Sequence, residues 1–515
     1  MTVLSASLPR AVLLGATLLP GAALADLAPA DVWQHFKDVS TLYGGTLEGA
    51  TSEQGDTLSV SDMNFALDLP FDAGKLDLDL GAVQFREGSG GTVTLLYPSE
   101  MMVKVTYTSK EGETFGGDIN LTLEDFVSTA SGQPGEITFD YAADRIGVEL
   151  DVPNLPEGLE SYSASGFLAD VTGSSAQTLA SGLKADSRIS IGAHEFTASQ
   201  SMSLEDEDGR VEVKSSSGGD SLTAEGKTVI PAGGIDLVNL ASALRSGLSA
   251  IGTADVTGYR TDQVSAKDGA VIARQRVTAA SYATTFSLDD TGVLIEGPSE
   301  DLRLEIEMPT MGGMMFGANI DSVSGTMRAP LLMDDAFAPA EVKLDLVGLS
   351  PDETLWGMFD PTGILPRDPA DLSLELTADI RHRVEWLDFA NVESAVDALS
   401  GLPVEPESAQ LNKLRISAAG AEVTGEGAFT FDLTDLQSFD GLPRPEGKLT
   451  LRAKGLNALA QKLVKLGMPE DQINGGLMML GMFSASDPEG GEDARITVLE
   501  VTPDGQVLNN GMRLR

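Results

Sequence analysis

Apolar and polar residues alternate along most of the chain with a period of two, which is the pattern of a strand with one buried and one wet face. The clearest alternating segments are residues 76–80, 103–107, 119–123, 302–306, 342–346, 372–376 and 429–433. Asp-Gly pairs at 208–209, 268–269 and 504–505 favour tight hairpins. Parallel sheets would instead show continuous apolar runs alternating with helices. The pattern predicts a mainly β (α+β) protein with elongated, antiparallel, meandering sheets.

Helical periodicity is confined to four or five short segments. They are residues 31–43, 235–251, 389–399 and the pair 456–466 and 469–483, with a further short helix expected at 353–359. So few helices cannot cover the apolar faces of the predicted strands, and such a face must pack on another sheet, on helices or on a ligand. Two arrangements fit: sandwiches whose sheets cover each other, which the composition favours, or a long curved sheet whose concave apolar face forms a groove for acyl chains.

The first 25 residues have the build of a secretory signal peptide. Arg10 precedes an apolar run over residues 11–19, and the small-residue pattern of Ala23 and Ala25 predicts cleavage before Asp26. A buried or interfacial N-terminal helix is the alternative. We expect a signal peptide at 1–25, an N-terminal β-rich lobe at 26–232 and a C-terminal β-rich lobe with helices at 233–515, or one continuous domain in place of the two lobes.

Later segments fall far short of the ~20 apolar residues that a membrane-spanning helix needs. The densest apolar stretch, residues 477–483, has seven residues. The sequence therefore predicts no transmembrane anchor after signal removal, and a periplasmic location with secretion as the alternative.

Charge narrows the range of partners. The 515 residues include 78 acidic and 34 basic side chains and no cysteine, for a formal net charge of −44. Nucleic acid is a poor partner for such a chain, because phosphate contacts need clustered Lys and Arg. The lack of cysteine excludes disulfides, thiolate metal sites and a cysteine nucleophile. The acid excess is a solubility device, an adaptation to salt, or a surface for basic partners or divalent cations.

No motif in the sequence predicts a catalytic, cofactor-binding or metal-binding residue. The three histidines, His35, His194 and His382, lack a second histidine at metal-binding spacing, and we interpret them as surface or capping side chains. The acidic run at 205–208 does not fit an EF-hand and is interpreted as a hairpin tip. A cluster of four methionines remains: Met308, Met311, Met314 and Met315. The spacing of their thioether groups fits a Cu(I) site. The alternatives are that these flexible side chains fill an irregular apolar core or form the wall of a groove.

Three segments resemble the domain of unknown function 2125, an uncharacterised Gram-negative envelope family. They are the opening at residues 30–33 with 54–58, the stretch 355–361 continuing through 365–369, and the ending 501–511. The family has no established catalytic residues, so the resemblance implies none here. The predicted architecture also resembles AsmA-like envelope proteins, whose curved sheets are associated with phospholipid traffic or outer-membrane biogenesis, although those proteins commonly keep an N-terminal membrane anchor.

Together these patterns predict a non-enzymatic periplasmic protein. It binds a lipid or another amphiphile, or assists envelope assembly with envelope proteins, through an apolar sheet surface. An acidic module that binds a protein partner or divalent cations is the alternative, and an enzyme of unknown class is the third possibility.

Overall fold

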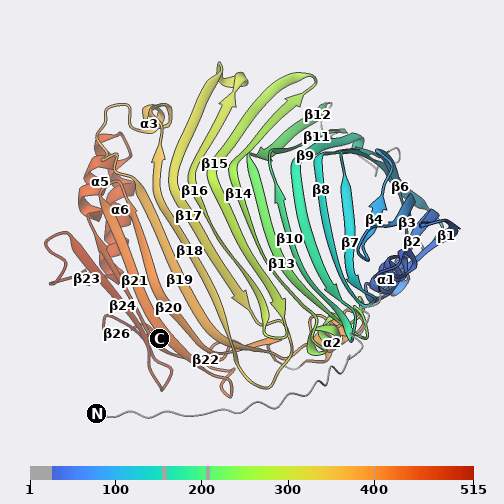
Figure 1. Ribbon diagram of the computed structural model, residues 1–515. Coiled ribbons are helices and arrows are strands. Elements are labelled where there is room, and N and C mark those ends of the chain that lie inside the picture. Colours follow the sequence, from blue (N-terminus) through green and yellow to red (C-terminus); the bar gives the residue numbers. More distant parts are fainter. Residues whose placement is uncertain (1–25, 153–158, 204–208, 400) are drawn as a thin grey trace, which may run out of the picture.

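The computed structural model describes residues 26–152, 159–203, 209–399 and 401–515. Its 26 described strands form a single antiparallel sheet. The sheet curves from the N-terminal strands at one end to the C-terminal strands at the other (Figure 1). The fold prediction is confirmed as mainly β and antiparallel. The sandwich that the composition favoured is wrong, because every described strand belongs to the one sheet.

The N-terminal half of the sheet comprises thirteen strands and a short 3-10 turn. Their bounds are β1 (Thr46–Gln54), β2 (Thr57–Leu69), η1 (Pro70–Asp72), β3 (Gly74–Glu87), β4 (Val93–Leu96), β5 (Glu100–Thr108), β6 (Thr114–Glu124), β7 (Val127–Gln133), β8 (Glu136–Asp151), β9 (Leu159–Thr178), β10 (Gly182–Ile191), β11 (His194–Ser203), β12 (Arg210–Gly219) and β13 (Ser221–Pro231).

The same arrangement of strand pairings occurs twice, once between β3 and β8 and once between β9 and β14 (Ser249–Lys267), the first strand of the C-terminal half. β3 pairs with β4 along one part of its length and with β5 along the other, and β8 pairs with β7 and β6 in the same way. β9 likewise pairs with β10 and β11, and β14 pairs with β13 and β12. In both blocks four short strands fill two strand positions between two long strands.

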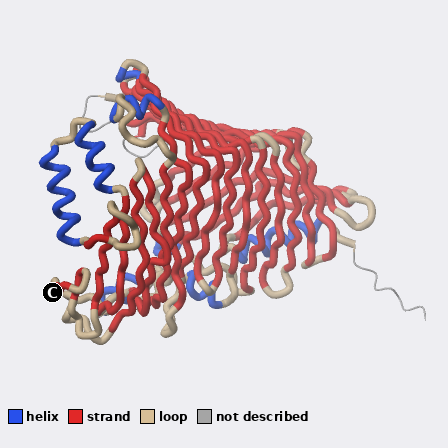
Figure 2. The backbone as a smooth tube through the Cα atoms, turned by 90° about the vertical axis from the view of Figure 1, so that its left-hand side faces the viewer, coloured by secondary structure: helices blue, strands red, loops and turns tan. Residues whose placement is uncertain are grey.

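The C-terminal half is largely a meander, in which each strand up to the last long ones pairs with the next along the chain, side by side in Figure 2. Its strands and second 3-10 turn are β14 (Ser249–Lys267), β15 (Ala270–Asp289), β16 (Gly292–Met308), η2 (Pro309–Met311), β17 (Met314–Ala329), β18 (Ala338–Pro351), β19 (Ala370–His382), β20 (Val404–Ala418), β21 (Ala421–Asp432), β22 (Arg444–Lys454), β23 (Ala485–Ser486), β24 (Ala494–Val501), β25 (Val507–Asn509) and β26 (Met512–Arg513). Strand pairing continues across residue 232, since β13 pairs with β14.

Six α-helices lie in the described part of the chain. They are α1 (Pro29–Leu42), α2 (Leu240–Arg245), α3 (Glu353–Phe359), α4 (Val392–Ala398), α5 (Leu456–Lys465) and α6 (Glu470–Phe483). The predictions for α1, α3, α5 and α6 are confirmed within two residues at each end. The prediction of a helix over 235–251 is wrong in extent: the Asp236 carboxylate accepts the N–H groups of Val238 and Asn239 in a turn before α2, and Gly247 ends the helix with a φ of +100°.

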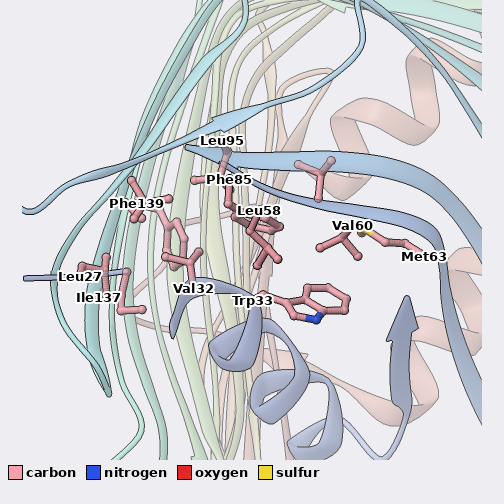
Figure 3. Close-up of a cluster of buried hydrophobic side chains, with 13 residues drawn as sticks. Leu27, Val32, Trp33, Leu58, Val60, Met63, Phe85, Leu95, Ile137 and Phe139 are labelled. Carbon is pink, nitrogen blue, oxygen red and sulfur yellow. The ribbon is translucent and has the colours of Figure 1, made fainter. Parts of the chain in front are cut away.

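The largest buried cluster lies where α1 packs against the N-terminal strands (Figure 3). Val32 and Trp33 of α1 meet Phe85 of β3, and Phe36 stacks on Phe139 of β8 with ring centroids 5.5 Å apart. The helix contacts β1, β2 and β3 on one side and β10 on the other, so the sheet wraps around it. We call the face of the sheet that packs on α1 the inner face.

Residues with positive φ interrupt several long strands and change the phase of the alternation. Val60 and Met63 both lie in the α1 cluster, although they are three residues apart, because Asp62 between them has a φ of 52°. The same conformation occurs at Asp170, Gly258 and Asp301. Aspartate and glycine suit these positions because they tolerate the left-handed region.

Candidate functional site

The strand register places an unbroken row of apolar residues across nine strands, from β15 to β24. Each member lies opposite the next on the neighbouring strand, so all of them share one face of the sheet. The row is Phe286, Ile295, Met327, Val342, Leu376, Leu411, Gly427, Leu449 and Leu499. We call it the apolar row.

The apolar row lies on the inner face. The register leads back from Phe286 through Gly252, Gly226, Ser187 and Ser175 to Phe139, whose ring packs on α1. A second row runs beside it, two residues along each strand, and is also apolar. Its members are Leu288, Val293, Ala329, Ala340, Ala378, Ala409, Phe429, Gly447 and Val501.

Little of the protein covers the apolar row in the C-terminal half. The side chains of Met327, Val342 and Leu376 are 45%, 45% and 41% exposed. By contrast, Phe85 and Ile137 under α1 are almost fully buried. The inner face is therefore closed by a helix at its N-terminal end and open between β17 and β22.

A groove of about 610 Å³ follows the two rows across β17 to β22. Its inward side chains are almost all aliphatic or aromatic, and the alanines of the second row leave space between the larger residues of the first. They are Met327, Ala329, Ala340, Val342, Leu376, Ala378, Ala409, Leu411, Phe429 and Leu449. The volume lies in the range of sites that hold small molecules.

The opposite face of the same strands carries charge. Lys343 pairs with Glu341 at 2.7 Å, and Arg415 pairs with Glu422 at 2.8 Å and with Asp371 at 3.1 Å. The hydrogen bond from Lys343 to Glu341 raises the pKa of Lys343. The sheet thus has one apolar and one charged face, as the alternation predicts, and no second layer covers the apolar one over β17–β22.

The three histidines do not converge. His35 and His194 are buried, with exposed fractions of 2% and 8%, so their interpretation as surface side chains is wrong. His35 lies on α1, where its Nε2 is 2.8 Å from the Gln177 side-chain oxygen. His382 accepts a hydrogen bond from the Trp386 indole at Nδ1 and has its Nε2 2.8 Å from the Pro330 carbonyl oxygen.

The methionine cluster is split between different sides of β16 and β17. Met308 lies opposite Met314, whereas Met315 lies opposite Glu307 on the other face of the sheet. Met311 belongs to the turn η2 and is 44% exposed. This arrangement does not gather the four sulfur atoms at one site. Among the described residues, no group of three or more His, Cys, Asp or Glu side chains could hold a metal ion.

Some predictions concern residues that the structure does not describe. Ala23 and Ala25 of the predicted cleavage site lie outside the described residues, as does the acidic run 205–208; Asp26 is described and exposed. In the described ranges, no helix has both the length and the apolar character needed to cross a membrane.

The segment that carries the family resemblance folds around a buried carboxylate. Asp360 follows α3 and accepts the N–H groups of Ile364 at 2.9 Å and Leu365 at 2.7 Å. Burial raises the pKa of Asp360, but these backbone donors, the Thr362 hydroxyl and the positive charge of Arg367 together outweigh it, and the pKa lies below its usual value. The Arg367 guanidinium lies over the Trp356 ring, 5.4 Å from its centroid. These contacts give the segment a structural role in closing the end of α3.

Comparison with known families bears out the resemblance for the C-terminal part of the chain. Residues 317–508 match the model of a family described as an uncharacterized protein conserved in bacteria (DUF2125). This range contains the segment around Asp360, most of the closing hairpin and every residue that lines the groove, while the opening at residues 30–33 lies outside it. Neither the curated proteins nor the solved structures include a match to the chain.

Proposed function

We propose that this chain binds the acyl chains of a lipid or another amphiphile along its inner face. The groove on that face is formed by the part of the chain that matches the DUF2125 family, residues 317–508. The observation that carries the proposal is the apolar row, which crosses nine strands and is open to solvent where it forms the groove. An exposed continuous apolar surface of this kind marks a binding site in a folded protein.

The dimensions of the inner face support an extended hydrocarbon ligand. Neighbouring strands are about 4.8 Å apart, so a row across nine strands is roughly 38 Å long. The hydrocarbon core of a bilayer is about 30 Å thick and contains two layers of acyl chains, so one chain extends over ~15 Å. The row is therefore long enough for the chains of one or more lipids, which would lie across the strands.

The proposal requires neither catalysis nor a cofactor. The inward side chains of the groove are aliphatic or aromatic, whereas the polar residues of the same strand segments, such as Arg328 and Glu341, alternate with them and point to the opposite face. With the predicted signal peptide, these properties support a non-enzymatic role in the periplasm, as a carrier or an accessory protein of envelope assembly.

The proposal can be tested with a charge placed in the groove. Leu376 is in the apolar row, whereas Thr377, the next residue, points to the opposite face. We expect Leu376→Glu to abolish co-purifying lipid and to weaken binding of a fluorescent fatty acid at least tenfold, because a carboxylate in an apolar site must be desolvated. Thr377→Glu adds the same charge to the same strand and should bind like the wild type.

Native mass spectrometry and lipid extraction of protein purified from the periplasm of its host give the readout. Phospholipid or fatty acid on the wild type and on Thr377→Glu, but not on Leu376→Glu, supports the proposal. A lipid-free wild type that also fails to bind the fluorescent fatty acid overturns it and favours the acidic interaction module.

A further inference from the structure

The α5–α6 hairpin stands at the C-terminal edge of the sheet (Figure 2) and is anchored at both ends. At its start, the Asp493 carboxylate accepts the N–H groups of Asn457 and Ala458. At its end, the Phe483 carbonyl accepts hydrogen bonds from the side chains of Asn509 and Asn510, at 3.0 and 3.1 Å. The hairpin is therefore held in a fixed position beside β25 and β26.

One side of α6 packs on α5 and the other is exposed and apolar. Ile473, Leu477 and Leu480 are half-buried and recur at helical spacing, as expected for the packed side. Met478, Met479 and Met482 are 70%, 63% and 64% exposed. These are the three highest exposures among the large apolar side chains of the described residues.

The C-terminal hairpin extends this surface. Asn509 and Asn510, which bind the end of α6, lead directly into Met512 and Leu514, and both of these apolar side chains are more than half exposed. We call the exposed side chains of the two segments the edge patch: Met478, Met479, Met482, Phe483, Met512 and Leu514.

Charge around the edge patch differs from that of the whole chain. Residues 472–483 of α6 contain no charged side chain, and the segments 456–468 and 507–515 beside it contain basic residues and no acidic ones. The basic residues are Lys462, Lys465, Arg513 and Arg515. Arg513 donates a hydrogen bond to the main-chain oxygen of Arg515 at 3.0 Å, and Arg515 donates one to the Ser438 carbonyl oxygen at 2.8 Å. The acidic residues of α6, Glu470 and Asp471, lie in its first turn, so basic side chains stand beside the uncharged remainder of this helix in a protein with a net charge of −44.

We propose that the edge patch docks the protein on a phospholipid bilayer. An apolar helix side that enters the boundary between headgroups and acyl chains, with Lys and Arg at its margin to meet lipid phosphates, is the design of an interfacial helix. Methionine suits this partner, because its flexible side chain adapts to a surface without fixed shape. The proposal goes beyond the lipid-binding groove, from which the edge patch is distinct in residues.

The test is flotation of the full exported chain with phosphatidylcholine vesicles, which avoid repulsion between an anionic surface and the acidic protein. The variant combines Met478→Glu, Met479→Glu and Met482→Glu. The control combines Met102→Glu, Met315→Glu and Met333→Glu, which replace exposed methionines outside the patch and the groove and change the charge equally. We expect the wild type and the control to float and the patch variant to lose at least tenfold in vesicle binding.

Lipid content separates this proposal from the proposed function. All three proteins should carry the same co-purified lipid, because the groove is unchanged, and a thermal melt confirms that each is folded. A wild type that does not float, or a patch variant that floats equally well, overturns the membrane proposal. Light scattering provides a further test. A dimeric wild type and a monomeric patch variant would also overturn the membrane proposal, because the edge patch would then join two copies of the chain.

Discussion

At the residue scale, His35 couples proton binding to the packing of α1. Its ring is buried against Phe139, with centroids 5.7 Å apart, and Nδ1 has no hydrogen-bond partner among the described residues. Burial lowers the pKa of His35 below 6.5, although Gln177 and Asp38 act in the opposite direction. The folded protein therefore favours the neutral imidazole.

This shift predicts a loss of stability in mild acid. A histidine whose pKa is lower in the folded state contributes stability that is present above its unfolded pKa of 6.5 and is lost as the pH falls through its folded pKa. We expect His35→Gln to reduce the fall in the free energy of unfolding between neutral pH and pH ~5. Urea denaturation at several pH values measures this, and an equal pH dependence in both proteins would contradict it.

At the scale of elements, α1 and the strands around it form the best-buried part of the molecule. Phe85 is completely buried beneath Trp33 and Phe36, whereas Phe196 on β11 is 42% exposed. The two phenylalanines therefore give a matched pair for the contribution of this cluster to stability.

We expect Phe85→Ala to lower the free energy of unfolding by about 3–5 kcal/mol, because it removes a large buried ring and leaves a cavity. Phe196→Ala should cost less than ~1 kcal/mol at its more exposed position. Chemical denaturation of both variants measures the difference. Similar losses would show that α1 does not form the principal core.

The sequence predicts the individual strands and helices better than it predicts which of them lie side by side in the fold. Alternation identifies the inward side of strands such as 342–346 and 372–376, and helical periodicity locates segments such as 456–466. The alternation does not reveal that Met327 lies opposite Val342 within a single row of nine strands, because register depends on turns and bulges. Nor does it reveal whether a second layer covers that row, which is why the composition favoured a sandwich. The edge patch depends on a contact between α6 and Asn509 that the sequence does not indicate.

At the scale of the whole molecule, self-repulsion among acidic groups is the dominant electrostatic effect. The net charge of −44 acts against a compact fold, while the ion pairs of the charged face are largely solvent-exposed and contribute ~0–1 kcal/mol each.

Salt should therefore stabilise the protein, because the screening length falls to about 10 Å at 0.1 M ionic strength. We expect the melting temperature to rise with NaCl concentration, and a fall would show that attractive ion pairs dominate. Calcium at equal ionic strength provides the control: a much larger rise with calcium than with NaCl would indicate specific cation binding and favour the acidic module.

The meander between β14 and β22 also governs how the chain can fold. Each of these strands pairs with its neighbours in the sequence, so most of its hydrogen bonds close short loops, at little cost in chain entropy. A polypeptide that emerges end first can add one strand at a time to an existing edge, as repeat proteins grow from unit to unit. We therefore expect the sheet to extend from the helix-covered N-terminal core toward its C-terminal edge as the chain emerges.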